Sequence, residues 1–187
     1  MFTLFKANPA RDAAERAYRS VVEQSRQTVF YAELGVPDTI DGRFDLICLH
    51  AFLYLRRLQR EQPEVAEISQ FFVDAMFADF DRGLREMGTG DLSVGRQIKR
   101  MAQAFYGRIA AYEEGLATVD DGKLRAALER NLFGTAPADA ANLAAMAAHV
   151  RAAAARLDLQ DAAALRAGEM SFGAPPPVQT SVAAEGR

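Results

Sequence analysis

The chain has 187 residues, half of them hydrophobic and a quarter charged, which is typical of a single globular domain with a packed core. Its formal net charge of −3 excludes a protein that binds DNA through overall positive charge, although local basic patches are compatible with it. The single cysteine excludes an internal disulfide, and no secretory signal or apolar run of roughly 20 residues is present, so we expect a soluble cytoplasmic protein.

Apolar residues recur at helical spacing along nearly the whole chain. A first helix is predicted from about Pro9 to Tyr31, with Asn8 as its cap and proline at its first position, where proline is favoured. A loop rich in glycine, proline and aspartate follows at 35–42. The next helix, predicted over about 44–61, is apolar on nearly all sides. Such a pattern indicates a central helix with neighbours around it.

Three more helices are predicted in the middle of the chain. One begins at Pro63 and ends just before Gly88, and the next covers about 94–116. The third is capped by Asp120 and ends at Gly134. No stretch alternates as a β-strand does, so the chain is predicted to be all-α.

The last third of the chain is rich in alanine, which favours helix but offers little apolar area for burial. Two thin helices are predicted within 136–167, capped by Asp139 and Asp158. Residues 171–187 contain three consecutive prolines and little to bury, so we expect a disordered tail. The sequence predicts a single-domain bundle of six or seven helices over residues 1–170.

A cluster of glycines at 88–95 precedes a basic segment and has the glycine spacing of a P-loop. A P-loop needs a strand before its glycines and a lysine followed by serine or threonine after them, and this segment has neither. We therefore interpret the cluster as a boundary between two helices. Gly88 is expected in the left-handed conformation, and Ser93 or Asp91 is expected to cap the following helix. An exposed helix start beside basic side chains could still hold an anion.

His50 and His149 are the only histidines, and neither belongs to the ligand spacing of a zinc or di-iron site. For His50 we favour a packed side chain bonded to a neighbouring carboxylate or carbonyl over a haem ligand. Cys48 lies in the same apolar run and is expected to be an inert core thiol. We find no combination of nucleophile, base and oxyanion donor. The sequence predicts no enzyme, metal site or cofactor.

Two groups of basic residues stand out against this background. The first ends the apolar helix and consists of Arg56, Arg57 and Arg60. The second lies in a segment without acidic residues and consists of Arg96, Lys99, Arg100 and Arg108. Both groups are compatible with ordinary solvated faces. The functional interpretation is a docking surface for a polyanion or an acidic protein.

Three blocks of the sequence carry a resemblance: FDLICLHAFLYLRRL (44–58), FVDAMFADFDRGLREMG (72–88) and GDLSVGRQIKRMAQAFYGR (90–108). In this order, over roughly residues 40–160, the chain resembles the ubiquinol–cytochrome c chaperone family. This family is the bacterial counterpart of the mitochondrial factors that assist assembly of the cytochrome bc1 complex. The resemblance implies a helical, non-enzymatic assembly factor that binds newly made cytochrome b or another bc1 subunit.

The resemblance also suggests other partners and a location. Mitochondrial members of the family work with a small partner protein and near the ribosomal exit tunnel, so the ribosome is a candidate partner. Because the client is a membrane protein, peripheral contact with the inner membrane is compatible with a cytoplasmic location. DNA is not expected as a partner.

A client-binding protein needs an accessible apolar surface with a charged rim. Besides the two basic groups, Phe71 and Phe77 are candidates, because they lie off the predicted inner stripe of the helix that begins at Pro63. The alternative function is a helical module that binds a small molecule or lipid, with the apolar run 44–55 lining a pocket and the basic groups holding an anionic head group. An enclosed pocket would favour this alternative, whereas an open groove would favour a client.

Overall fold

The computed structural model describes residues 8–134 and 138–175 and is helical throughout, with no strand in these ranges. Six helices have 11 residues or more, and α2 and α8 have five each, which confirms the predicted all-α fold. The elements are α1 (Pro9–Ser25), α2 (Thr28–Ala32), α3 (Ile40–Leu58), the 3-10 helix η1 (Gln59–Glu61), α4 (Ala66–Glu86), α5 (Asp91–Ala117), α6 (Gly122–Leu132), α7 (Ala140–Asp158) and α8 (Ala162–Arg166). None of these helices is long and apolar enough to cross a membrane.

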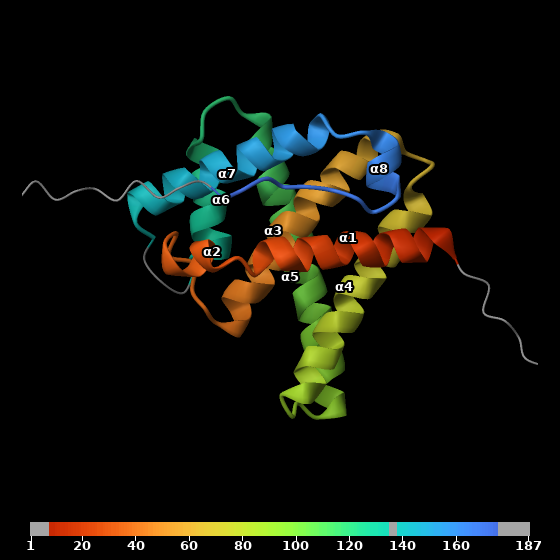
Figure 1. The fold of residues 1–187 in the computed structure, drawn as a ribbon. Helices are drawn as coiled ribbons and strands as arrows, with labels where there is room; N and C mark the ends of the chain where they lie inside the picture. The colour runs from red at the N-terminus through yellow and green to blue at the C-terminus, as the bar shows by residue number, and fades with distance from the viewer. Residues whose placement is uncertain (1–7, 135–137, 176–187) are drawn as a thin grey trace, which may run out of the picture.

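The predicted central helix is α3, which packs against α1, α5, α6 and α7 (Figure 1). Thirteen of its 19 residues are buried, so it supplies apolar side chains in every direction. Phe52 and Tyr54 are fully enclosed: the Phe52 ring lies 5.7 Å from that of Tyr112 in α5, and the Tyr54 ring lies 5.0 Å from that of Phe72 in α4. The core is therefore built around one helix.

The predicted first helix is divided in two. Asn8 caps it as expected, since its side chain accepts hydrogen bonds from the amides of the second and third helical residues. However, α1 ends at Ser25 and α2 begins at Thr28, so the expected continuous helix to residue 31 was wrong. The Tyr31 hydroxyl donates to the carbonyl of Ser25, and the turn carries Phe30 into the core, where it is fully buried. Burial of this ring in the core accompanies the break.

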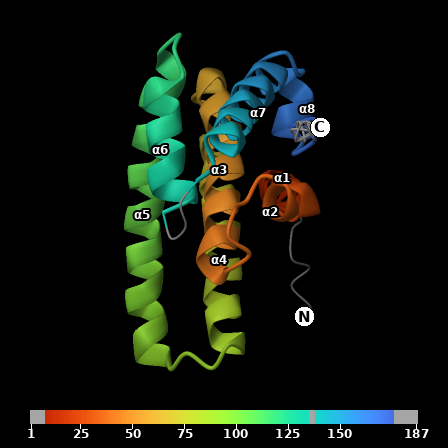
Figure 2. The same ribbon diagram turned by 90° about the vertical axis from the view of Figure 1, so that its left-hand side faces the viewer.

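The glycine cluster joins α4 to α5 as an antiparallel hairpin whose tip projects from the body (Figure 2). Gly88 has φ +82°, which confirms its expected left-handed conformation. The expected cap at Ser93 or Asp91 was wrong, because α5 begins earlier and Gly90 occupies the cap position. Asp91 instead pairs with Arg85 across the hairpin.

The C-terminal part packs more extensively than its composition suggested. Asp139 caps α7 as predicted, but α7 runs on through Asp158, and the cap of α8 is Asp161. The tail was expected to begin at residue 171, yet Phe172 is 4% exposed, with its ring 5.1 Å from that of His50. Packed chain therefore continues past the expected boundary. The rest of that tail, residues 176–187, lies outside the described residues.

Candidate functional site

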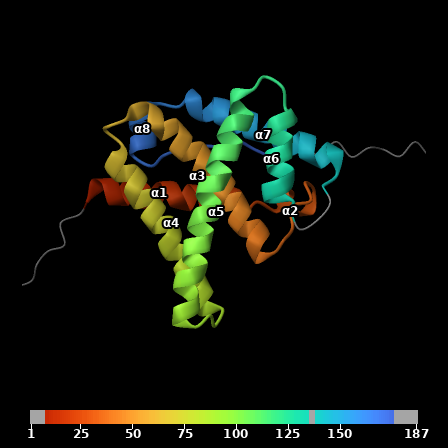
Figure 3. The ribbon, with the colours of Figure 1, turned by 180° about the vertical axis from the view of Figure 1, so that it is seen from behind.

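A groove of about 860 Å³ opens between the start of α3, the α4–α5 hairpin and the end of α6, elements that can be followed in Figure 3. Leu84, Met101 and Leu132 contribute apolar surface to it. Ile40 and Met87 also line it and are 61% and 51% exposed, so the groove is open to solvent. Two of these five side chains are methionines, which adapt easily to different apolar partners.

An ion pair lies beside this apolar surface. Arg108 Nη2 is 2.6 Å from Asp45 Oδ1, both side chains are largely buried, and both residues line the groove. Burial raises the pKa of the Asp45 carboxyl to about 6, although the nearby guanidinium partly offsets this effect. Arg108 Nε and the Oε1 atom of Gln97, also in the groove, have no hydrogen-bond partner among the described residues. The groove thus combines apolar contacts for a segment of another protein with a largely buried ion pair in its wall.

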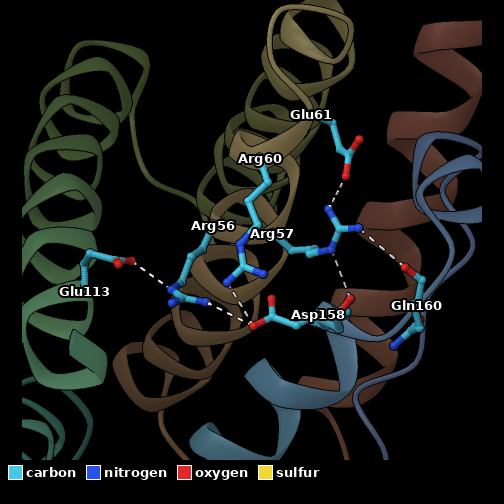
Figure 4. Close-up of polar contacts among 8 residues, drawn as sticks. Arg56, Arg57, Arg60, Glu61, Glu113, Asp158 and Gln160 are labelled. Carbon is cyan, nitrogen blue, oxygen red and sulfur yellow. Dashed lines mark hydrogen bonds and ion pairs between the residues drawn. The ribbon is translucent and has the colours of Figure 1, made fainter. Parts of the chain in front are cut away.

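The basic group at the end of α3 is engaged in internal contacts (Figure 4). Arg57 is 7% exposed, and its guanidinium donates to the carbonyl of Leu157 at 3.2 Å and to Glu61 Oε1 at 2.7 Å. Arg60 lies 2.9 Å from Asp158 Oδ2 in α7.

Arg56 bridges two helices in the same region. Its Nε is 3.0 Å from Glu113 in α5, and its Nη1 is 3.9 Å from Asp158 in α7 (Figure 4). Arg56 and Arg57 at the end of α3 and Arg60 in η1 therefore tie this end of the helix to α5 and α7. We remove Arg57 from the candidate docking residues, because its guanidinium faces the protein interior and its hydrogen bonds are made there.

The second basic group divides according to its position on α5. Arg96, Lys99 and Arg100 are exposed and take part in none of the ion pairs formed within residues 8–134 and 138–175. We call these three residues the basic stripe. Arg108, by contrast, lies over the ring of Phe44 at 5.3 Å and is held by the buried ion pair described above. Arg108 contributes to the groove, and so does Arg100 of the basic stripe, whereas Arg96 and Lys99 face solvent outside it.

The two phenylalanines proposed as client contacts lie outside the groove. Both are partly buried and pack against the core. The guanidinium carbon of Arg11 lies 4.8 Å from the centre of the Phe71 ring, and Phe77 makes an edge contact with Phe105. Sequence reasoning missed Ile40 as a groove residue, because it precedes the periodic apolar run on which the helix was predicted.

The two histidines meet in the core at the junction of α1, α3 and α7. His50 Nε2 lies 3.2 Å from His149 Nε2, and His50 Nδ1 lies 2.9 Å from the carbonyl of Leu46, which is the type of contact predicted for it. Ser25 of α1 is 3.0 Å from the same nitrogen. Burial lowers the pKa of His50 to about 3 and that of His149 to about 4, so both are neutral at pH 7. No group of three or more metal-ligating side chains occurs in the described part of the chain.

Comparison with protein families places residues 32–172 under a model described as ubiquinol-cytochrome C chaperone. The chain is 30% identical over 149 residues to ubiquinol-cytochrome-c reductase complex assembly factor 1 of Xenopus laevis, with 80% of this chain and 74% of that protein covered. It is 34% identical over 108 residues to the mitochondrial protein CBP3 of Saccharomyces cerevisiae, which covers 56% of this chain and 32% of the yeast protein.

A solved structure is also similar to this one. The crystal structure of the Cbp3 homolog from Brucella abortus superposes with a TM-score of 0.79 at 35% identity, covering 89% of this chain and 91% of the other. The mouse and human assembly factors are considerably longer, and the chain spans 47% and 46% of their respective lengths.

Proposed function

Because the chain belongs to the ubiquinol–cytochrome c chaperone family, a family of complex III assembly chaperones, we propose that newly made cytochrome b is its client. In this proposal the protein acts by non-covalent binding and carries out no reaction. It works as a peripheral protein on the cytoplasmic side of the inner membrane, where a membrane-protein client is inserted. The names of its relatives support a role in assembly, and the geometry of the groove supports the mode of binding.

The observation that carries the proposal is the open, apolar groove between α3, the α4–α5 hairpin and α6. An exposed groove with methionines on its surface suits an amphipathic helix laid along it, a common mode of peptide recognition. The alternative, a small-molecule or lipid-binding module, calls for a pocket that encloses most of its ligand. Ile40 and Met87 are more than half exposed on the rim, so the groove favours a client segment.

The proposal can be tested by placing charge on the rim of the groove. In the double variant Ile40→Glu/Met87→Glu both substituted side chains are already exposed, so the fold should be retained. A deletion strain carrying this variant should assemble much less bc1 complex, measured from the reduced-minus-oxidised absorbance of cytochrome b in membranes. The matched control is Val119→Glu/Leu159→Glu, which changes two exposed apolar residues outside the groove.

The outcomes separate the function from its site. Normal bc1 levels in the deletion strain would refute the assembly function itself. If the deletion strain is deficient but the rim variant restores assembly fully, the client binds elsewhere. A photo-crosslinking amino acid at position 87 should capture cytochrome b, whereas the same group at position 159 should not. Capture of a different bc1 subunit at position 87 would keep the groove and change the client.

A further inference from the structure

Five exposed residues of α5 lie on its outer face and do not line the groove. Leu92, Arg96, Lys99, Gln103 and Tyr106 follow one another at steps of three and four residues, so they lie along one side of the helix. All five are exposed, with Leu92 88% and Tyr106 59% accessible. At a rise of 1.5 Å per residue the outer face is roughly 21 Å long from Leu92 to Tyr106. α5 lies on the outside of the molecule, at the edge of the view in Figure 2 and in front in Figure 3.

The cations on this face are not neutralised by their neighbours. Near the hairpin tip, Arg82 pairs with Asp79, and Arg85 pairs with Asp81 and Asp91. The basic stripe has no such partner within the part of the chain that the structure describes, and no acidic residue interrupts the segment 92–108. Positive charge is therefore concentrated here in a chain whose net charge is −3.

We propose that this face of α5 docks on an anionic lipid bilayer. Arg96 and Lys99 complement the negative head groups, and each cation near such a surface strengthens binding. Leu92, at the exposed start of α5, inserts its apolar side chain at the boundary between head groups and acyl chains, and Tyr106 suits the interface at the other end of the outer face. A leucine exposed to this degree at the tip of a projecting hairpin favours lipid over RNA, which would gain little from an aliphatic contact.

Docking in this way would bring the client groove to the membrane. Arg100, the third residue of the basic stripe, lies beside the outer face and also lines the groove, so the wall that α5 contributes to the groove adjoins the outer face. A client helix leaving the bilayer would then meet the groove directly. This connection rests on the proposed function, whereas lipid binding itself does not.

The charge requirement is tested by sedimentation with vesicles of neutral phosphatidylcholine or of phosphatidylcholine with phosphatidylglycerol. Wild-type protein should sediment with the anionic vesicles only, and less so as salt is raised. Arg96→Glu/Lys99→Glu should weaken partitioning at least about 25-fold, since each cation contributes about five-fold. Arg100 is left unchanged so that the groove is intact. The control Arg19→Glu/Arg26→Glu makes the same charge change at exposed sites on and next to α1 and should bind nearly as wild type.

Insertion is tested by tryptophan fluorescence. The chain contains no tryptophan, so a single introduced one reports on its own position only. The emission of Leu92→Trp should shift to shorter wavelength when anionic vesicles are added, and that of Val119→Trp, fully exposed beyond the far end of α5, should not. The proposal would be overturned if the wild-type protein bound neutral and anionic vesicles equally, or if both double variants lost binding to the same extent. Emission shifts at both tryptophans would overturn it as well. Binding of the wild-type protein to a ribosomal RNA hairpin but to no vesicle would also overturn it and make RNA the occupant. No client is present in these assays, so their failure would not be a failure of the assembly function.

Discussion

Replacement of Arg57 by methionine should destabilise the protein substantially, because the Arg57 side chain is buried. Methionine retains the apolar stem but removes the hydrogen bonds to the Leu157 carbonyl and to Glu61. Breaking a buried ion pair typically costs about 3–5 kcal/mol. The Glu61 side chain is 24% exposed, and Arg166 Nη1 lies 3.7 Å from its Oε2 atom, so its charge stays partly solvated and paired when Arg57 is lost. We therefore expect the free energy of unfolding to fall by about 3 kcal/mol. For a domain of this size, that loss lowers the melting temperature by roughly 6–12 °C.

The measurement is thermal and urea unfolding followed by circular dichroism at 222 nm. Arg96→Met is the matched control, since it removes an exposed arginine of the basic stripe and should change stability by no more than about 0.5 kcal/mol. If Arg57→Met melts within about 2 °C of wild type, the guanidinium contributes little to the fold. A stable Arg57→Met protein that fails to support bc1 assembly would return Arg57 to the candidate docking residues.

Three further perturbations probe the core. A Cβ atom at Gly115 would lie 2.7 Å from Leu124 Cα, so Gly115→Ala should force α5 and α6 apart and cost about 1–3 kcal/mol in urea unfolding. Phe105 is fully buried, so Phe105→Ala should lower the free energy of unfolding by about 3–5 kcal/mol, again measured in urea. Acidification should also destabilise the fold. The stability from the neutral histidines is fully present above about pH 6.5 and is lost as the pH falls toward their folded pKa values of about 3 and about 4. The raised pKa of Asp45 acts in the opposite direction: its contribution to stability is present below pH 3.8 and is lost as the pH rises through about 6. Between pH 4 and 6 the unfolded state therefore binds about one proton more than the folded state, because it gains two protons on the histidines and lacks the one on Asp45. The free energy of unfolding should then fall by roughly 1.4 kcal/mol for each unit by which the pH is lowered, and Asp45→Asn should steepen this slope.

The architecture was predictable wherever a local pattern determined it. The apolar run of α3 identified the central helix, because a helix that is apolar on all sides must be surrounded. Gly88 marked the hairpin, since the left-handed conformation that ends α4 favours glycine. The break after α1 left no comparable signal: the residues around Ser25 are compatible with helix, and the contacts of the displaced Phe30 are with residues distant in sequence.

The candidate site was less predictable, because its elements come together only in three dimensions. The groove combines residues from Ile40 to Gly134, and no spacing within one segment reveals it. The two basic groups look alike in sequence, yet Arg57 is buried and Lys99 is exposed. What separates them is the neighbouring helix: the end of α3 meets carbonyls and carboxylates of α7, whereas the outer face of α5 meets solvent.

The packing of the C-terminal segment against α1 has a consequence for synthesis. Gly168 lies so close to the backbone of Ala13 that a Cβ there would be 2.1 Å from its carbonyl oxygen, and Arg16 donates to the carbonyl of Ala167. These contacts join residues about 150 positions apart, and at about 5–20 residues per second a ribosome needs roughly 8–30 s to make the intervening chain. During that time the apolar faces of α1 and α3 are not yet packed against the C-terminal segment. A protein that we propose shields another nascent chain thus leaves its own core open until its synthesis is nearly complete.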